Sequence, residues 1–265
     1  GVFLDSTKTI WIADTMNSCI KFVNSNNELV LFAGKNNDSG YSGDNGLATS
    51  SQLSYPTNVV VDENNNVYIS DTGNNVIRKV DTSGIISTFA GTGRSGYSGD
   101  GEDAINAQLN TPQGIYIDSY NDLYIADTGN NVIRKVSDGI ITTFAGTGEP
   151  GYSGDNNLAT MARLNAPTGL AVNISGNLFI TDTNNNVIRM INILSNEITT
   201  IAGTGVAGYS GGDGSNANTA MFNKPTGITI DRNGFLFVND TGNQVIRQIV
   251  SSDSSFNSSN IYLFF

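Results

Sequence analysis

The stretch YIADTGNNVIRKV, residues 124–136, decides the fold because the chain carries it in five versions. The other four are WIADTMNSCIKFV (11–23), YISDTGNNVIRKV (68–80), FITDTNNNVIRMI (179–191) and FVNDTGNQVIRQI (237–249). Successive copies are 55 to 58 residues apart, measured at the aspartates Asp14, Asp71, Asp127, Asp182 and Asp240. A fixed period of about this length is typical of repeat architectures. We therefore expect five units, at about 1–55, 56–111, 112–166, 167–224 and 225–265.

Each unit reads as four short strands separated by turn-forming residues. In the second unit these strands are expected at 56–62, 66–70, 75–80 and 84–91, where β-branched and aromatic residues are frequent. A long glycine-rich connection, residues 91–111, leads to the next unit and has room for one helical turn. Four antiparallel strands per unit with one long connection predict an all-β fold, a single β-propeller domain over residues 1–265.

Several motifs together resemble the NHL-repeat family of β-propellers over the whole chain. They are P-T-G-h-h-h-D, where h is apolar, then Y-I-A-D-T-G-N-N-V-I-R-K-V, T-T-F-A-G-T-G and G-Y-S-G-D-G. The resemblance implies a toroid of four-stranded blades, usually six, that serves most often as an interaction platform. Some relatives are enzymes, including amidating lyases and strictosidine-synthase-like or lactonase-like propellers, and others bind RNA.

Five units where the family usually has six suggest that one blade is unseen. We expect a six-bladed ring, with these residues a segment of a longer chain. A closed ring of five blades is the alternative.

Composition restricts the function. The 265 residues are 38% hydrophobic and 14% charged, with a formal net charge of −11, one cysteine and no histidine. An acidic surface disfavours binding to nucleic acid or anionic lipid, and no apolar run of about 18 residues suggests a membrane span. Without histidine, the usual triads and zinc sites cannot form from these residues alone. We predict no cofactor and no metal site.

The repeated aspartate and an arginine seven residues later form the first candidate network. We expect each aspartate to accept hydrogen bonds from N–H groups two or three residues on, closing an Asx turn. Gly73 and Gly129 are expected to supply a positive φ within that turn. The arginine should pair with an aspartate, and Lys21 replaces it in the first unit, where we expect a weaker pair. A structural network is favoured over a ring of ligand-binding groups. Its arginines are Arg78, Arg134, Arg189 and Arg247.

The GYSGD loops form the second candidate, a binding face. Long loops carry function more often than strands, and these loops should share a face with the DTGNN turns. Calcium could bind such carboxylates, but the spacing lacks a dedicated D-x-D-x-D-G loop, and bracing between blades is the favoured role. The tyrosines are Tyr41, Tyr97, Tyr152 and Tyr209, and the aspartates are Asp44, Asp100, Asp155 and Asp213.

Other recurrent residues are assigned to packing and turns. Aromatic residues on each second strand, such as Trp11 and Tyr68, should pack between blades. Cys19 should be a buried thiol. Aspartates such as Asp62 should form the first hairpin turn of each unit.

Four N-x-S/T sequences bear on location. Asn173 and Asn257 should lie in hairpin loops on one face and Asn37 in a loop on the other, whereas Asn239 abuts a strand end. Glycans on Asn173 and Asn257 would leave the GYSGD face open to a partner. This pattern favours an extracellular or cell-surface protein, with the cytoplasm as the alternative.

The five units differ too little to build one asymmetric catalytic pocket. We therefore favour a non-catalytic scaffold that binds protein, glycan or copies of itself through one propeller face. The alternative is a catalytic propeller resembling the lyase or lactonase relatives, with its chemistry supplied outside this segment.

Overall fold

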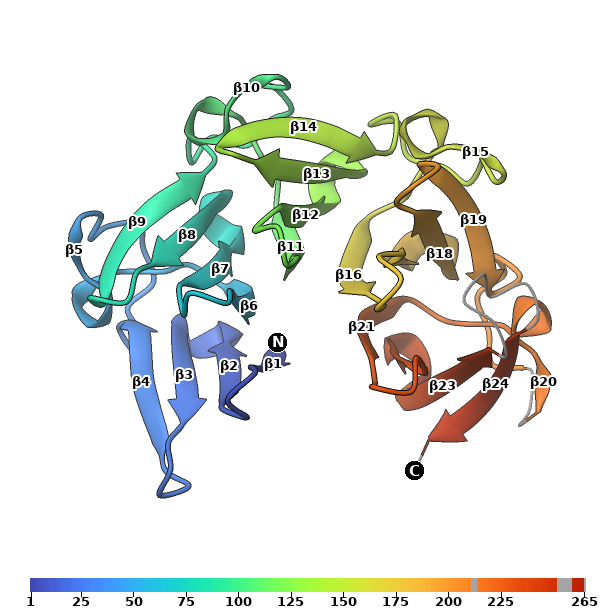
Figure 1. The fold of residues 1–265 in the computed structure, drawn as a ribbon, viewed down its shortest axis with the longest axis horizontal. Helices are drawn as coiled ribbons and strands as arrows, with labels where there is room; N and C mark the ends of the chain where they lie inside the picture. The colour runs from blue at the N-terminus through green and yellow to red at the C-terminus, as the bar shows by residue number, and fades with distance from the viewer. Residues whose placement is uncertain (211–213, 252–258, 265) are drawn as a thin grey trace. The chain divides into compact units, whose positions relative to one another are not determined.

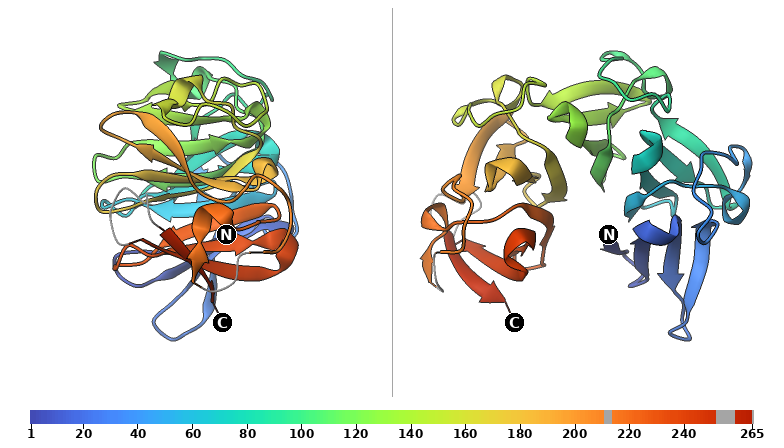
Figure 2. Two further views of the ribbon diagram at one scale, coloured as in Figure 1. Left: turned by 90° about the vertical axis from the view of Figure 1, so that its right-hand side faces the viewer. Right: turned by 180° about the vertical axis from the view of Figure 1, so that it is seen from behind.

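A computed structural model describes residues 1–210, 214–251 and 259–264. The described residues form five antiparallel β-sheets, one for each sequence repeat, joined by long loops (Figure 1). Figure 2 gives two further views of these sheets. The all-β propeller class is confirmed, and the number of blades equals that of the five-bladed alternative.

Each blade contains the four strands that the sequence predicts. In blade 1 they are β1 (Val2–Leu4), β2 (Ile10–Asp14), β3 (Cys19–Val23) and β4 (Leu29–Gly34). In blade 2 they are β6 (Pro56–Val61), β7 (Val67–Asp71), β8 (Val76–Val80) and β9 (Ile85–Ala90). In blade 3 they are β11 (Pro112–Ile117), β12 (Leu123–Asp127), β13 (Val132–Ser137) and β14 (Ile140–Ala145).

Blades 4 and 5 repeat this order. Blade 4 consists of β16 (Pro167–Val172), β17 (Leu178–Asp182), β18 (Val187–Asn192) and β19 (Glu197–Ala202). Blade 5 consists of β21 (Pro225–Ile230), β22 (Leu236–Asp240), β23 (Val245–Ser251) and β24 (Ser259–Phe264).

Blades 2 to 5 also have a fifth, two-residue strand that the sequence did not reveal. It comes from the long loop before the blade and pairs antiparallel with the blade's last long strand, as Gly46 does with Ile86. A single 3₁₀ turn follows it, which agrees with the one helical turn expected there. The short strands are β5 (Gly46–Leu47), β10 (Glu102–Asp103), β15 (Asn157–Leu158) and β20 (Ser215–Asn216). The 3₁₀ turns are η2 (Ala48–Ser50), η4 (Ala104–Asn106), η6 (Ala159–Met161) and η8 (Ala217–Thr219).

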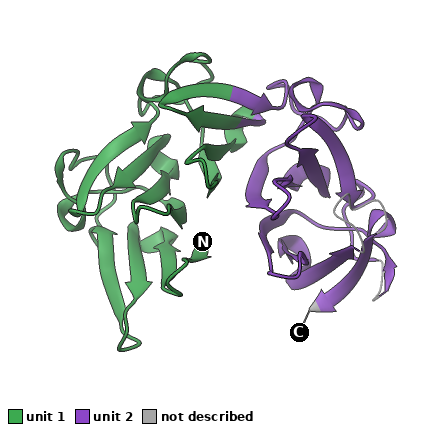
Figure 3. Ribbon diagram, in the orientation of Figure 1, with its two compact units in different colours: residues 1–130, 134–142 green, residues 131–133, 143–265 purple. Residues whose placement is uncertain are grey.

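The chain divides into two compact units within blade 3 (Figure 3). One unit comprises residues 1–130 and 134–142 and contains blades 1 and 2 with most of blade 3. The other comprises residues 131–133 and 143–265 and contains blades 4 and 5.

Within each unit the apolar core lies between neighbouring blades. Trp11 and Ile20 of blade 1 share a cluster with Val67 and Ile86 of blade 2. Equivalent clusters join blades 2 and 3 around Tyr68, and blades 4 and 5 around Phe179. The expected packing role of these aromatic residues is confirmed.

Polar contacts reinforce these interfaces at the ends of the first strands. The Thr72 hydroxyl of blade 2 donates to the Pro112 carbonyl of blade 3 at 2.6 Å. The Thr183 hydroxyl of blade 4 donates in the same way to the Pro225 carbonyl of blade 5 at 2.8 Å. Blade 2 is therefore fixed to blade 3, and blade 4 to blade 5, by both apolar packing and hydrogen bonds.

Two smaller expectations are also met. Cys19 is buried, its Sγ donates to Asn36 Oδ1 at 3.2 Å, and burial raises the pKa of its thiol. Asp62 Oδ1 accepts from the N–H groups of Asn64 and Asn66 at 2.9 and 2.7 Å, which forms the predicted turn of the first hairpin.

Candidate binding face

The aspartate that ends the second strand of blade 2 accepts a backbone N–H from the preceding loop, and from its own turn it accepts a side-chain amide instead of a backbone N–H. After Asp71 the chain forms the 3₁₀ turn η3 (Thr72–Asn74), which closes through the N–H of Asn75 donating to the Thr72 carbonyl at 3.2 Å. Asp71 Oδ1 accepts from the Ser54 N–H at 2.6 Å, and Oδ2 accepts from Asn74 Nδ2 at 2.8 Å. The predicted Asx turn is wrong, because the 3₁₀ turn is closed by its own backbone and the carboxylate is left to bind the segment before the blade.

The glycine of the motif also has a different role from the predicted one. Gly73 does not adopt a positive φ, and the left-handed residue is Asn75, with φ 56°. A Cβ at Gly73 would lie 2.4 Å from Ser54 Oγ and 2.9 Å from the Ser54 carbonyl oxygen. Gly73 therefore permits a close approach of the preceding loop, to which its N–H donates at 2.8 Å.

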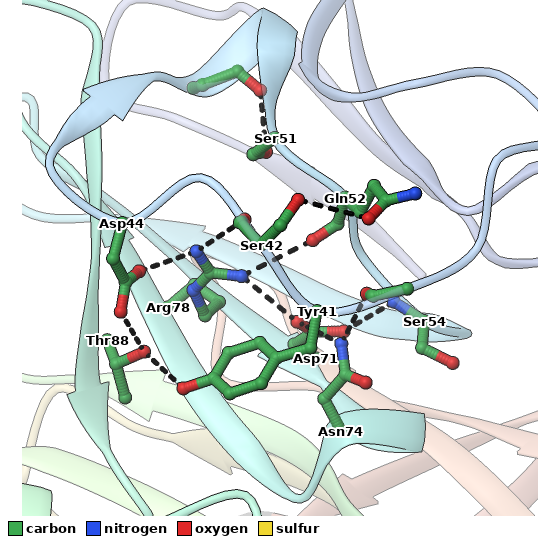
Figure 4. Close-up of polar contacts among 12 residues, drawn as sticks. Tyr41, Ser42, Asp44, Ser51, Gln52, Ser54, Asp71, Asn74, Arg78 and Thr88 are labelled. Atoms are coloured by element: carbon green, nitrogen blue, oxygen red, sulfur yellow. Dashed lines mark hydrogen bonds and ion pairs between the residues drawn. The ribbon is translucent and has the colours of Figure 1, made fainter.

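The arginine on the third strand joins the two sequence motifs into one cluster (Figure 4). Arg78 is fully buried, with Nη2 2.6 Å from Asp44 Oδ1 and Nη1 3.4 Å from Asp71 Oδ2. The Tyr41 ring covers the guanidinium at 5.1 Å from its centroid. Tyr41 and Asp44 belong to the GYSGD loop, so this loop is attached to the blade that follows it in sequence.

Thr88 completes the cluster from the neighbouring strand. Its hydroxyl lies 2.7 Å from the Tyr41 hydroxyl and donates to Asp44 Oδ2 at 2.8 Å. Both Nη groups of the guanidinium thus contact carboxylates and its face contacts the ring, whereas the buried Arg78 Nε has no hydrogen-bond partner among the described residues. The prediction for this loop was bracing between blades, whereas these contacts attach the loop to the single blade that follows it.

Blades 3 and 4 repeat the cluster closely. Arg134 Nη2 lies 2.7 Å from Asp100, and Nη1 lies 3.6 Å from Asp127. Arg189 Nη2 lies 2.8 Å from Asp155, and Nη1 lies 3.4 Å from Asp182. The rings of Tyr97 and Tyr152 cover these guanidinium groups at 5.2 and 5.3 Å.

In blade 5 the same roles fall to Arg247, Asp240 and Tyr209. Arg247 Nη1 lies 3.5 Å from Asp240 Oδ2, and the Tyr209 ring lies 5.4 Å from the guanidinium carbon. Asp213, the fourth loop aspartate of the candidate face, lies outside the described residues.

Burial dominates the electrostatics of the inner aspartates. Desolvation raises the pKa of Asp71, Asp127 and Asp182 to about 6, although the backbone, asparagine and arginine donors oppose it. Asp14 of blade 1 shows the opposite direction, because the hydrogen bond from Lys21 in a more exposed setting lowers its pKa. The same position in the repeat therefore has two electrostatic environments.

Blade 1 forms a simpler pair. Lys21 Nζ lies 2.7 Å from Asp14 Oδ2, and their side chains keep 16% and 26% of their surface exposed. Among the described residues it has no second carboxylate partner, unlike Arg78. The expectation of a weaker pair is consistent with this exposure, although the contact itself is short.

The two asparagines of DTGNN have roles that the sequence did not suggest. Asn74 Nδ2 bridges Asp71 and the Gly40 carbonyl at 2.8 and 2.7 Å. Asn75 Oδ1 accepts from the Thr111 N–H, just before the first strand of blade 3, at 2.9 Å. Asn186 makes the equivalent contact to the Lys224 N–H at 2.9 Å. The sequence signal that could have indicated these roles is the recurrence of two asparagines after DTG, the second of which adopts a left-handed conformation, as Asn75 does.

The GYSGD tyrosines combine an internal contact with exposed surface. Each ring has one face on an arginine, yet Tyr41, Tyr97, Tyr152 and Tyr209 keep 44 to 59% of their surface exposed. The contact of Asn74 with Gly40 places this loop beside the DTGNN turn, as expected. We call the surface that these loops and turns form on each unit the loop face. It presents rings held by buried ion pairs.

The possible glycosylation residues occupy different places. Asn37 is exposed and its N–H donates to the Asn17 carbonyl at 2.9 Å, which puts it on the loop face. Asn173 is half-buried in the turn between β16 and β17, where Oδ1 accepts from the N–H groups of Ser175 and Asn177. Asn257 lies outside the described residues.

Within the described part of the chain, no group of three or more histidine, cysteine, aspartate or glutamate side chains could hold a metal ion. Nor does any helix in residues 1–210, 214–251 and 259–264 have the length and apolar character of a membrane span.

Comparison with protein families gives a match to the teneurin NHL domain over residues 4–97. Among curated proteins, the chain is 30% identical over 253 residues to Protein SUPPRESSOR OF QUENCHING 1, chloroplastic, from Arabidopsis thaliana, covering 91% of this chain and 24% of that protein. It is 29% identical over 250 residues to Teneurin-3 of Mus musculus, covering 85% of this chain and 9% of that protein. The chain thus spans about a quarter or less of these relatives.

Solved structures share the fold at low sequence identity. Virginiamycin B lyase from Staphylococcus aureus matches with a TM-score of 0.59 and 17% identity, over 100% of this chain and 68% of the lyase. A gluconolactonase from Xanthomonas campestris gives 0.62 and 14%, over 99% and 74%. A chain of a nidogen/laminin complex gives 0.63 and 14%, over 100% and 84%.

Proposed function

We propose that this chain, which is an NHL-repeat β-propeller, is a non-catalytic scaffold that binds a protein partner through its loop face. The observation that carries the proposal is the state of the repeated charged groups. Arg78, Arg134 and Arg189 are fully buried between two aspartates each, so these groups serve the blade. The tyrosines stacked on them reach solvent, and so in part do the loop aspartates.

The exposed tyrosines suit a protein interface. A tyrosine offers a large apolar ring with a polar tip and loses little side-chain freedom on binding, and such residues are enriched at interfaces. Here each ring is already held in place by an arginine, so less ordering remains to be done when a partner binds. One propeller neighbour was solved in a nidogen/laminin complex, which supports this use of the fold.

Glycan and a second copy of the chain are weaker candidates for the partner. A formal net charge of −11 opposes close approach of two copies at low ionic strength. The loop face repeats the same side chains in several blades, which suits a broad contact better than one small sugar pocket. We therefore favour a protein partner.

We propose an extracellular or cell-surface location, with the cytoplasm as the alternative. The sequon at Asn173 supports it, since this residue lies in the β16–β17 turn, whereas a glycan on Asn37 would lie on the loop face proposed for the partner. Removal of N-glycans with a glycosidase from protein purified from its natural source should lower its mass. An unchanged mass would remove this support.

The catalytic alternative rests on likeness to a lyase and a gluconolactonase at 17% and 14% identity, which is a likeness of fold. Within the described residues the recurrent carboxylates named above are paired with arginine or lysine or engaged in turns. The scaffold is therefore the function that the site supports best.

Site-specific photo-crosslinking tests the proposal. A photo-reactive phenylalanine analogue at Tyr97, on the loop face, should capture a partner in cells that produce the protein, and mass spectrometry identifies it. The same analogue at Tyr120 is the matched control, because this exposed tyrosine lies in the β11–β12 turn at the opposite end of β12. Tyr120 should capture less of that partner.

Binding measurements with the purified partner then give the contribution of each tyrosine to the binding free energy. Tyr97→Ala should weaken binding by about 1 to 3 kcal/mol, the range of an interface anchor, whereas Tyr120→Ala should leave it unchanged. Equal effects of the two substitutions, or a larger effect of Tyr120→Ala, would contradict the assignment of the loop face.

A further inference from the structure

Each GYSGD loop has two positions whose residues change from blade to blade. The serine of the motif forms a bridge to one residue on the returning part of the loop, which we call the cross-loop residue. We call the second residue before the glycine that opens the motif the tip residue. The tip residues are Asp38, Arg94, Glu149 and Val206, and the cross-loop residues are Gln52, Gln108, Arg163 and Met221. No pair occurs twice although the motif is repeated, so the fold does not dictate these side chains and they are available for recognition.

The tip residue is matched within its own loop in three of the four loops. Gln52 Nε2 donates to Asp38 Oδ1 at 2.8 Å. Arg163 Nη2 lies 2.6 Å from Glu149 Oε2, in an ion pair whose two side chains are exposed. The loop that precedes blade 5 has apolar residues at both positions. The charged tip residues of these loops therefore already have partners inside the chain.

Arg94 is the tip residue that lacks such a partner. Its cross-loop residue, Gln108, directs Oε1 to the Ser98 hydroxyl, which donates at 3.3 Å. The Asp100 carboxylate of the same loop pairs with Arg134 at 2.7 Å. Arg94 is exposed, and its guanidinium contacts no acceptor in the part of the chain that the structure describes. Its planar set of donors is therefore available to bind a carboxylate.

The backbone beside Arg94 is held in place. Ser95 forms a bridge to Leu109, and the Gly96 N–H donates to the Leu109 carbonyl at 3.2 Å. Asn130 Nδ2 donates to the Gly96 carbonyl at 2.6 Å, which attaches the loop to the DTGNN turn of blade 3. Because the backbone is ordered before binding, a partner needs to order only the Arg94 side chain.

Tyr97 follows three residues later in the same loop. Its ring lies over the buried Arg134 guanidinium at 5.2 Å and remains 44% exposed. Arginine and tyrosine are the residue types that carry much of the binding free energy in protein interfaces. The loop thus offers a cation for an acidic group and a fixed ring for an apolar one.

The surrounding charges restrict the kind of acidic group. Asp100 keeps 46% of its side-chain surface exposed, and Glu102 and Asp103 are exposed as well. These carboxylates repel a densely charged polyanion such as a sulfated polysaccharide, which one unpaired arginine cannot neutralise. A single carboxylate beside an uncharged side chain matches the loop better.

We propose, building on the proposed function of the loop face, that Arg94 and Tyr97 select the protein partner. They bind a segment that carries one aspartate or glutamate beside an aliphatic or aromatic residue. The Arg94 guanidinium donates to the carboxylate, and the apolar side chain packs on the exposed part of the Tyr97 ring.

Short random peptides displayed on phage are suitable probes. Peptides are selected on the purified chain and then depleted on the Tyr97→Ala variant, under conditions in which both have the same circular dichroism spectrum. The retained peptides need the loop face at Tyr97. They should carry an aspartate or glutamate next to an aliphatic or aromatic residue.

The affinity of one retained peptide, made synthetically, then measures the role of the guanidinium. Arg94→Gln should weaken binding by about tenfold or more, as expected for an arginine at the centre of an interface. Arg94→Lys should give an intermediate affinity, because it keeps the charge but loses the planar fork. Arg163→Gln is the matched control, since it removes the same charge from an exposed arginine that already pairs with Glu149. It should leave the affinity unchanged.

Charge reversal adds a result that loss of structure does not produce. A peptide whose acidic residue is replaced by lysine should bind Arg94→Glu more tightly than it binds the parent chain. Equal binding of this peptide to the two chains would contradict a direct contact between Arg94 and the carboxylate.

Several other outcomes would overturn the assignment of Arg94. They are retained peptides without an acidic residue, no retained peptide at all, equal effects of Arg94→Gln and Arg163→Gln, and binding of heparin that Arg94→Gln abolishes. The last would assign the loop to a sulfated polysaccharide. A peptide that needs Tyr97 but binds Arg94→Gln as well as the parent would remove Arg94 and leave the proposed function intact. The proposed function itself fails if photo-crosslinking at Tyr97 captures no more partner than at Tyr120.

Discussion

Replacement of Asp127 by alanine probes the cluster at its most buried carboxylate. The change removes hydrogen bonds from the Asn110 N–H at 2.7 Å and from Asn130 Nδ2 at 2.8 Å, and leaves buried Arg134 with Asp100 as its remaining carboxylate. Two hydrogen bonds to a charged acceptor are worth about 3 to 6 kcal/mol together. The cost of burying the carboxylate offsets part of this hydrogen-bond free energy, since desolvation raises the pKa of Asp127 to about 6. Each pKa unit corresponds to roughly 1.4 kcal/mol. We expect a net loss of up to about 3 kcal/mol.

Urea unfolding followed by circular dichroism measures this loss as a change in midpoint at constant slope. Asp103→Ala is the matched control, because it removes the same charge from an exposed side chain that makes no capping hydrogen bond. It should change stability by less than about 0.5 kcal/mol. If Asp127→Ala were no more destabilising than Asp103→Ala, the carboxylate would not brace the blade, and the ring of ligand-binding groups would become the better interpretation.

Three further predictions follow from the same clusters. The pKa values of Asp71, Asp127 and Asp182 are raised in the folded chain, which therefore binds more protons than the unfolded chain between about pH 4 and 6. The contribution of these groups to the unfolding free energy should therefore fall as the pH rises through that window. In urea titrations from pH 4 to 7, Asp182→Asn should reduce the decrease of the unfolding free energy with pH more than the charge-matched surface change Glu149→Gln. Equal pH dependence of the two variants would show that the buried aspartates do not cause the decrease. Tyr152→Phe keeps the ring over Arg189 but removes the 2.9 Å contact with the Thr200 hydroxyl, so thermal unfolding should show it less destabilised than Tyr152→Ala, and the reverse order would refute stacking. Gly73→Ala places a Cβ against Ser54 and should lower the unfolding free energy by about 1 kcal/mol or more. The double variant Gly73→Ala, Ser54→Gly should recover part of the loss, because it removes Ser54 Oγ but not the nearby Ser54 carbonyl oxygen. A lack of recovery would refute the steric explanation.

The repeated pattern was sufficient to predict the blades but not the partners of the polar side chains. Alternating apolar residues around Tyr68 and Tyr124 predict strands and their packing, because strand formation and burial depend on local periodicity. The contact of Asp44 with Arg78 joins residues 34 positions apart, and nothing in local spacing specifies such a distance. Local spacing therefore leaves the GYSGD loop and the DTGNN turn as two separate candidate features.

The two errors in the turn have a common physical origin. Aspartate and glycine after a strand usually indicate side-chain capping and a positive φ. In this repeat the 3₁₀ turn is closed by a hydrogen bond between its own backbone groups, so the Asp71 carboxylate is free to bind the Ser54 N–H. Gly73 leaves the space that Ser54 occupies. The two-residue strands were missed for another reason, because a pair of residues such as Glu102–Asp103 carries no periodicity that would identify a strand.

A double-mutant cycle between Asp155 and Arg189 tests the central claim most directly, namely that the loop face is built on internal ion pairs. Asp155 lies on the GYSGD loop, Arg189 lies on β18, and their side chains approach to 2.8 Å. The unfolding free energies of the parent, Asp155→Asn, Arg189→Gln and the double variant should give a coupling of about 1 to 3 kcal/mol. A coupling near zero would show that the two groups act independently and would contradict the account.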